Sequence, residues 1–101
     1  MAQVPAWFQG VLAAARRGRD SYGKRCGYAN AGAQLARHWQ DRWTDDEVTA
    51  AVAEFEDIDR EDDAGALAWL LRHLPAFVDN VPRRRRADFA RGFSEGYAEH
   101  G

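Results

Sequence analysis

Residues that could perform catalytic or metal-binding chemistry are few and widely spaced in this 101-residue chain. The one cysteine, Cys26, falls in an apolar helical pattern, which favours a small core residue over a nucleophile. The three histidines, His38, His73 and His100, have no partners at metal-ligand spacing. The chain contains no HExxH, CxxC, GxSxG or glycine-rich phosphate loop. We therefore expect a protein that is not an enzyme and that needs no metal and no cofactor.

Acidic residues are concentrated in one segment. Residues 44–63 carry ten carboxylates against Arg60, which gives a formal charge of −9. The D-I-D-R-E stretch alternates carboxylates as a calcium-binding EF-hand loop does. That loop needs glycine at its sixth position and glutamate at its twelfth, where this chain has Asp62 and Ala68. We expect no calcium site, and treat the segment as a candidate partner-binding surface. This acidic strip comprises Asp45, Asp46, Glu54, Glu56, Asp57, Asp59, Glu61, Asp62 and Asp63.

A run of four arginines follows Pro82, at the expected start of the last helix. Cations there oppose the helix dipole, which favours anions at this end. Arginine binds phosphates and carboxylates through paired hydrogen bonds, so a partner surface is one explanation. Solvation, or pairing with the acidic strip, is the other. The run has no helix-turn-helix, zinc-finger or ribonucleoprotein motif beside it. The candidate partner- or phosphate-binding residues of this basic run are Arg83, Arg84, Arg85, Arg86 and Arg91.

The small net charge of −2 hides this segregation, since residues 1–43 carry +5 and residues 64–101 carry +2. Such asymmetry concerns partners and self-association more than fold. The acidic isoelectric point of 5.9 argues against a dedicated DNA-binding protein. The chain has no 18-residue apolar stretch and no signal-peptide pattern, and one cysteine excludes an internal disulfide. We expect a cytoplasmic protein with no membrane contact.

The apolar pattern is helical nearly throughout. It predicts an all-α fold, a compact single-domain bundle of about five helices over residues 1–101. The first helix should begin near Pro5, with a stripe of apolar residues on one face. The second should begin at Asp20 or Ser21 and run to about Arg42.

The third and fourth helices have clear start signals. Thr44 and Glu47 form a capping box at the start of the third. Asp59 or Asp62 can cap the fourth, and Pro75 ends it or restarts a short turn. The expected core face of the fourth helix is a stripe of four leucines: Leu67, Leu70, Leu71 and Leu74.

The last helix, opened by Pro82, contains Gly92 and Gly96. Glycine costs about 1 kcal/mol against alanine in a helix interior, so close helix packing is the expected reason for both. Gly23 and Gly27 are the small residues expected to meet them on the second helix. Aromatic residues stand at every fourth position beside these glycines: Phe89, Phe93 and Tyr97.

In size, single-domain build, charge segregation and lack of catalytic residues, the chain resembles small helical proteins carried by phages and mobile elements, anti-CRISPR inhibitors among them. The resemblance concerns overall character and no diagnostic motif. It implies a non-catalytic inhibitor that occupies the functional or nucleic-acid-binding surface of another protein, through the acidic strip or the basic run.

Two alternatives remain open at this stage. The first is a small nucleic-acid-binding regulator that uses the basic run. The second is a structural module that only self-associates. The expected partner is another protein, such as a nucleic-acid-handling complex, and the chain is expected to be a monomer or homodimer.

Overall fold

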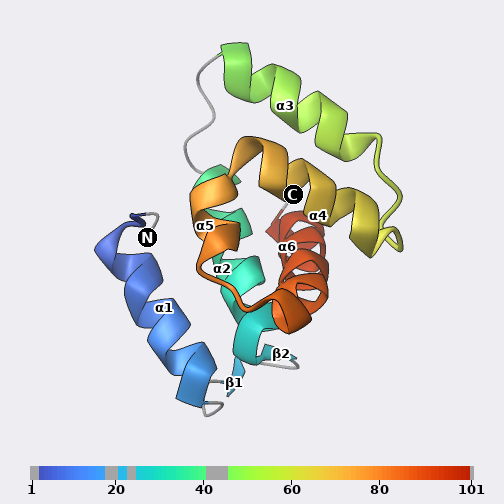
Figure 1. Ribbon diagram of the computed structural model, residues 1–101. Helices are drawn as coiled ribbons and strands as arrows, with labels where there is room; N and C mark the ends of the chain where they lie inside the picture. The colour runs from blue at the N-terminus through green and yellow to red at the C-terminus, as the bar shows by residue number, and fades with distance from the viewer. Residues whose placement is uncertain (1–2, 18–20, 23–24, 41–45, 101) are drawn as a thin grey trace.

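Helices make up nearly all the regular structure of the described residues. The computed structural model describes residues 3–17, 21–22, 25–40 and 46–100. The prediction of an all-α fold is confirmed (Figure 1). In chain order the elements of this described part are α1 (Ala6–Arg17), β1 (Ser21–Tyr22), β2 (Arg25–Cys26), α2 (Gly27–Gln40), α3 (Asp46–Glu56), α4 (Asp63–His73), α5 (Pro75–Asp79), the short 3₁₀ helix η1 (Arg83–Arg85) and α6 (Arg86–His100).

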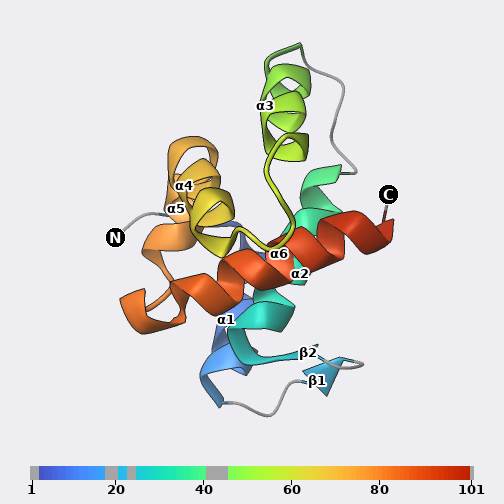
Figure 2. The same cartoon turned by 90° about the vertical axis from the view of Figure 1, so that its right-hand side faces the viewer.

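The helices α2 and α6 cross at the centre of the bundle and form its most extensive contact (Figure 2). A Cβ atom added at Gly92 would lie only 2.7 Å from the Cα of Ala29, and one added at Gly96 only 2.7 Å from the Cα of Ala33. From the other side, a Cβ at Gly32 would lie 2.7 Å from the backbone nitrogen of Phe93. The prediction that Gly92 and Gly96 permit close helix packing is therefore confirmed.

Of the two glycines predicted on the second helix to meet Gly92 and Gly96, Gly27 was wrong and Gly23 is not tested. Gly23 lies outside the described residues. Gly27 has a φ of +60° and open space around the position of a Cβ. A right-handed helix cannot continue through a positive φ, so α2 begins there and not at Asp20 or Ser21. The preceding residues instead form a minimal antiparallel pair, β1 with β2, and this also moves Cys26 out of the helix and into β2.

The helix α1 packs against α2, and its predicted apolar stripe is confirmed. Phe8, Leu12 and Ala15 are buried, and Val4, Trp7 and Val11 are partly buried around them. The ring of Phe8 meets Phe77 of α5 edge to face at 4.8 Å between centroids. The first helix is thus attached through aromatic contacts as well as through its aliphatic residues.

The leucine stripe predicted for α4 was only partly correct. Leu70 is buried and Leu67 and Leu74 are partly buried, but Leu71 is 41% exposed. The residue at the centre is Trp69, with no exposed surface. Its indole nitrogen donates a hydrogen bond to the Ala51 carbonyl of α3 at 2.9 Å. The large ring fills the space where α3, α4 and α6 meet, and this turns the leucine stripe partly away from the core.

Local signals at the ends of the later helices are confirmed where the structure describes them. Asp62 caps α4 by accepting a hydrogen bond from the Gly65 backbone nitrogen at 2.8 Å. Pro75 begins the short helix α5, and Pro82 precedes η1. The capping box at Thr44 lies outside the described residues. None of the described helices has the length and hydrophobicity that a bilayer-spanning helix requires.

Candidate functional site

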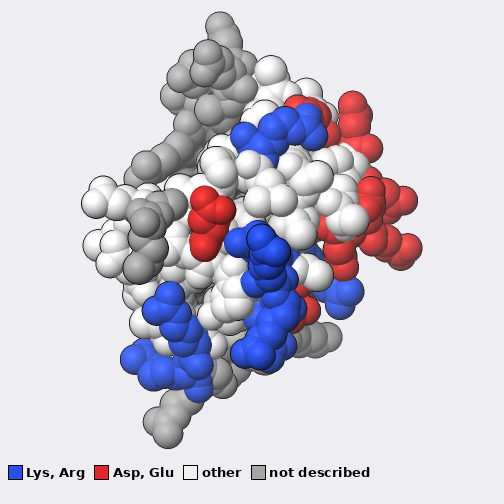
Figure 3. All heavy atoms as spheres, in the orientation of Figure 1, with Lys and Arg blue, Asp and Glu red and all other residues white. Residues whose placement is uncertain are grey.

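The acidic strip lies along one edge of the molecule, at the end of α3 and in the loop to α4. Figure 3 shows the acidic side chains gathered at this edge, while the larger groups of Lys and Arg lie in the lower half of the view. Asp45 lies outside the described residues, and Asp46 begins α3. The exposed members are Glu56, Asp57, Asp59, Glu61 and Asp62, whereas Glu54 and Asp63 are half-buried.

Two carboxylates of the strip pair with cations of neighbouring helices. Glu54 forms an ion pair with Arg72 of α4, and its other oxygen lies 3.2 Å from His73 Nε2. Asp63 accepts two hydrogen bonds from Arg91 of α6, at 2.9 and 3.2 Å. These bonds raise the pKa of the Arg91 guanidinium above its ordinary value. Arg91, a member of the basic run, is thus bound to a member of the acidic strip.

The loop between α3 and α4 uses part of its acidity to hold its own shape. Asp62 caps α4, and Asp59 accepts a hydrogen bond from the Glu61 backbone nitrogen at 3.0 Å. The side chains of Asp57 and Glu61 make no hydrogen bond or ion pair with any residue that the structure describes. The strip therefore presents free carboxylates on a loop whose backbone is fixed by turns.

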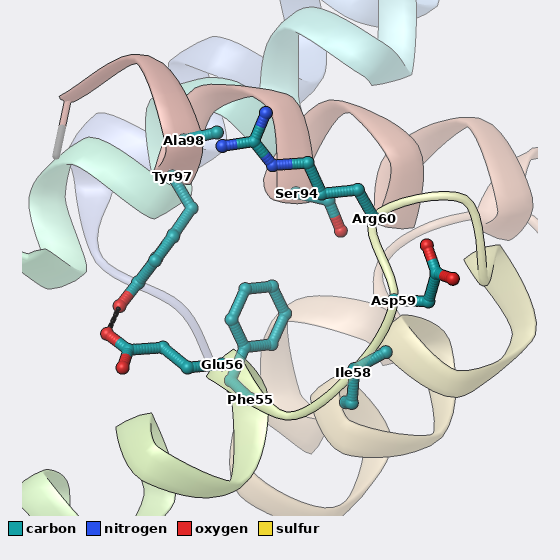
Figure 4. A pocket seen from close by; sticks show the side chains of 8 residues that line it. All are labelled: Phe55, Glu56, Ile58, Asp59, Arg60, Ser94, Tyr97 and Ala98. Atoms are coloured by element: carbon teal, nitrogen blue, oxygen red, sulfur yellow. Dashed lines mark hydrogen bonds between the residues drawn. The ribbon is translucent and has the colours of Figure 1, made fainter.

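A groove lies beside this loop, between it and the C-terminal half of α6 (Figure 4). It has a volume of about 180 Å³, and a second hollow of about 220 Å³ adjoins it across Arg60, Ser94 and Ala98. The two hollows together are called the α6 groove here. The α6 groove is lined by Phe55, Glu56, Ile58, Asp59, Arg60, Ser94, Glu95, Tyr97, Ala98 and Glu99.

Tyr97 forms one wall of the α6 groove. Its hydroxyl donates a hydrogen bond of 2.6 Å to Glu56 Oε1, and this links α6 to the end of α3. Partial burial raises the pKa of Tyr97 well above its ordinary value of 10.0, and the bond and charge of Glu56 raise it further. The ring of Tyr97 lies 5.0 Å from that of Phe55, which in turn meets Phe93 at 5.3 Å. The groove wall is therefore continuous with the aromatic core.

The structure divides the basic run. The first three arginines form η1, a 3₁₀ turn, and α6 itself begins only at Arg86. Arg86 donates through Nε to the Val81 carbonyl at 3.0 Å, and Arg85 lies 3.7 Å from Asp88. Arg83 and Arg84 are exposed. Their side chains make no hydrogen bond or ion pair within the part of the chain that the structure describes.

Two of the histidines, His38 and His73, pack against tryptophan rings. His38 stacks on Trp7 of α1 with 3.7 Å between ring centroids and 13° between planes. His73 lies 5.0 Å from Trp69 by the same measure. Among the described residues, no three His, Cys, Asp or Glu side chains converge as a metal site would require. The side chains of Cys26 and His100 lie outside the described part of the structure.

The α6 groove was missed at the sequence level. Its α6 wall uses Ser94 and Ala98, two small residues four apart, as do Gly92 and Gly96 on the opposite face. Ser94 and Ala98 each lie two positions from one of these glycines, which is about 200° around a helix. Small residues on both faces of α6 would therefore have indicated that another segment can approach each face closely. Only the structure shows that the face with Ser94 and Ala98 borders a groove and is not filled by a neighbouring helix.

Comparison with protein-family models, with curated proteins and with solved structures found no match to this chain.

Proposed function

We propose that the protein is a non-catalytic binding protein that docks its acidic edge onto a basic surface of a partner protein and so acts as an inhibitor. The acidic edge means the exposed carboxylates of residues 56–62, where five acidic residues stand against Arg60 and leave a formal charge of −4. Basic protein surfaces of this kind commonly hold nucleic acid. Occupation of such a surface would exclude the nucleic acid by charge and bulk, as the resemblance to anti-CRISPR inhibitors also suggests.

The observation that carries the proposal is the free state of Asp57 and Glu61 on a shaped loop. Carboxylates already paired within the fold have little left to offer a partner, as Glu54 and Asp63 illustrate. Asp57 and Glu61 are exposed, and no described residue neutralises them. Complementary charge across an interface speeds association and sets specificity. A fixed loop also lowers the entropy lost on binding.

A second candidate function has one observation in its favour. Arg83 and Arg84 are exposed and unpaired in the described part of the chain, as phosphate-binding arginines would be. The proposal for a nucleic-acid-binding regulator is weakened by the rest of the run, because Arg86 and Arg91 are held by Val81 and Asp63. Two unpaired arginines on a chain of net charge −2 form a small electrostatic footprint.

The test is affinity capture from a lysate of the source cells, with mass spectrometry, by wild type and two matched variants. Asp57→Lys/Glu61→Lys and Arg83→Glu/Arg84→Glu each change two exposed residues and shift the net charge by four units in opposite directions. The first should lose the partner, and the second should keep it. Added nucleic acid should release the partner from the wild type.

The opposite pattern would overturn the proposal. Loss of the partner only with the arginine variant would place the interface on η1. Direct nucleic-acid binding by the chain in a filter assay, steeply weakened by salt and abolished by Arg83→Glu/Arg84→Glu, would favour the regulator instead. If no partner is captured and the molecular mass of the protein in solution rises with its concentration, self-association would be favoured.

A further inference from the structure

We infer that the α6 groove receives a single arginine side chain from the partner protein. The inference rests on the proposed function, since it names the group that would anchor the partner at the acidic edge. The groove shares Glu56 and Asp59 with the acidic edge but does not include the two free carboxylates. The free carboxylates Asp57 and Glu61 lie on the loop, and the groove lies between that loop and α6.

The size and floor of the groove fit a long, narrow side chain. The two hollows, of about 180 and 220 Å³, are each smaller than the roughly 300–1,000 Å³ of typical cofactor and drug sites. Phe55, Ile58 and Ala98 supply apolar carbon along the floor and wall. Arginine buries its methylene stem on such carbon while its charged end reaches a polar rim. The second hollow extends the path in the direction of Glu95 and Glu99.

The rim charge selects a cation. Among the lining residues, four carboxylates stand against the single guanidinium of Arg60, which gives a formal sum of −3. Glu95 also interacts electrostatically with Arg91, outside the groove lining. The rim carboxylates are Glu56, Asp59, Glu95 and Glu99. Glu56 already accepts the Tyr97 hydroxyl, but a carboxylate offers about four lone-pair positions, so it can accept further bonds.

Arginine suits this site better than lysine. Its planar guanidinium binds carboxylates through paired hydrogen bonds, stacks on aromatic rings and is more weakly hydrated than an ammonium group. The rings of Phe55 and Tyr97 lie in the same wall. A guanidinium over an aromatic face gains a further cation–π attraction.

The charge of Arg60, a residue of this chain, opposes a guest arginine in the groove. Figure 4 shows Arg60 extending from the loop toward Ala98 on α6, along the side of the groove. Its side chain makes no hydrogen bond or ion pair with any described residue. A guest arginine would meet this like charge. Removal of Arg60 should therefore tighten binding, whereas removal of a lining residue usually weakens it.

The test is an amide ¹H–¹⁵N NMR titration of the protein with a capped pentapeptide that holds one arginine between glycines and serines. The matched control peptide has citrulline, which keeps the shape and removes the charge. The arginine peptide should shift the amide signals of Ile58, Ser94 and Ala98, and the citrulline peptide should not. Equal shifts with both peptides, or shifts confined to other residues, would overturn the inference.

Two variants sharpen the titration. Arg60→Gln should lower the dissociation constant of the arginine peptide about threefold. This is the factor expected for removal of one unit charge roughly 6 Å away in water. Ala98→Lys places a cation of the chain in the groove and should abolish the shifts, while Ala98→Gln adds similar bulk without charge and should retain part of them. Weaker binding by Arg60→Gln, or unchanged binding by Ala98→Lys, would contradict the assignment.

Failure here is distinguishable from failure of the proposed function. If Ala98→Lys still captures the partner while Asp57→Lys/Glu61→Lys does not, the acidic edge binds the partner without the groove. In that case the proposed function stands and the arginine site is wrong. If all these variants capture the partner equally, the acidic edge itself is not the interface.

Discussion

The substitution Gly92→Ala tests the close crossing of α2 and α6. In an ordinary helix interior this change would stabilise the protein by about 1 kcal/mol. At Gly92 the new Cβ would lie 2.7 Å from the Cα of Ala29. The carbonyl oxygen of Ala29 would lie nearer still. Carbon atoms pack at about 3.5–4.0 Å, so the two helices would have to separate by at least about 1 Å. Because backbone atoms form the obstacle, no rotation of a side chain can relieve it.

The expected net effect follows from these two opposing terms. Overpacking of a core costs about 1–3 kcal/mol, and contact with backbone places Gly92→Ala toward the upper end. After the gain in helix propensity, a net loss of about 2 kcal/mol is expected. Each kcal/mol shifts the melting temperature of a domain of this size by about 4–8 °C, so the variant should melt roughly 8–16 °C below wild type.

Gly10→Ala is the matched control. Gly10 also lies inside a helix, α1, but it is exposed and has no neighbouring atom within 4 Å of a Cβ. This variant should gain about 0.5–1 kcal/mol and melt a few degrees above wild type. Thermal unfolding followed by far-ultraviolet circular dichroism measures both. If Gly92→Ala melts at or above wild type, as Gly10→Ala should, the close approach of α2 and α6 is refuted.

Three other expectations concern the core, a cap and a titration. Trp69→Phe removes the buried donor to the Ala51 carbonyl and leaves a void, so urea unfolding should show a loss of about 2–3 kcal/mol; a loss under about 1 kcal/mol would contradict the packing described. Asp62→Ala should cost about 1 kcal/mol through loss of the α4 cap, whereas Asp57→Ala should stay within about 0.5 kcal/mol; equal losses would count against the cap. Folding raises the pKa of Tyr97, so the protonated hydroxyl stabilises the folded state. This contribution is complete below pH 10.0 and is lost as the pH rises further. Wild type should therefore lose more stability than Tyr97→Phe between about pH 9 and pH 11, and parallel urea-unfolding curves would refute this.

Local signals in the sequence predicted much of the fold. The proline before α1, the Asp62 cap and the Pro75 break act within a few residues, and the structure has all three. The start of α2 was mispredicted because periodicity does not report φ, and Gly27 carries a positive φ. The buried face of α4 was mispredicted because a leucine stripe shows which side of a helix is hydrophobic. It does not show which neighbouring helices cover that side. Trp69 is central because three helices leave a ring-sized space there.

The candidate site was predictable only as clusters of charge. Which charges remain free depends on pairs that are distant in sequence. Glu54 and Arg72 are 18 residues apart, and Asp63 and Arg91 are 28 apart. These pairs form because α3, α4 and α6 come together through Trp69 and its neighbours. The α6 groove has the same origin, since its two walls are joined by Tyr97 and Glu56, 41 residues apart.

The most direct test of the acidic edge as the binding surface is the dissociation constant of the captured partner for three proteins: wild type, Asp57→Lys/Glu61→Lys and Arg83→Glu/Arg84→Glu. Isothermal titration calorimetry at low and at physiological salt would supply these values. The expected result is at least about tenfold weaker binding by the acidic-edge variant, a factor that corresponds to about 1.4 kcal/mol. Affinity of the wild type should also fall as salt rises, and the arginine variant should bind as wild type does. Unchanged affinity of the acidic-edge variant, with loss in the arginine variant, would contradict the account.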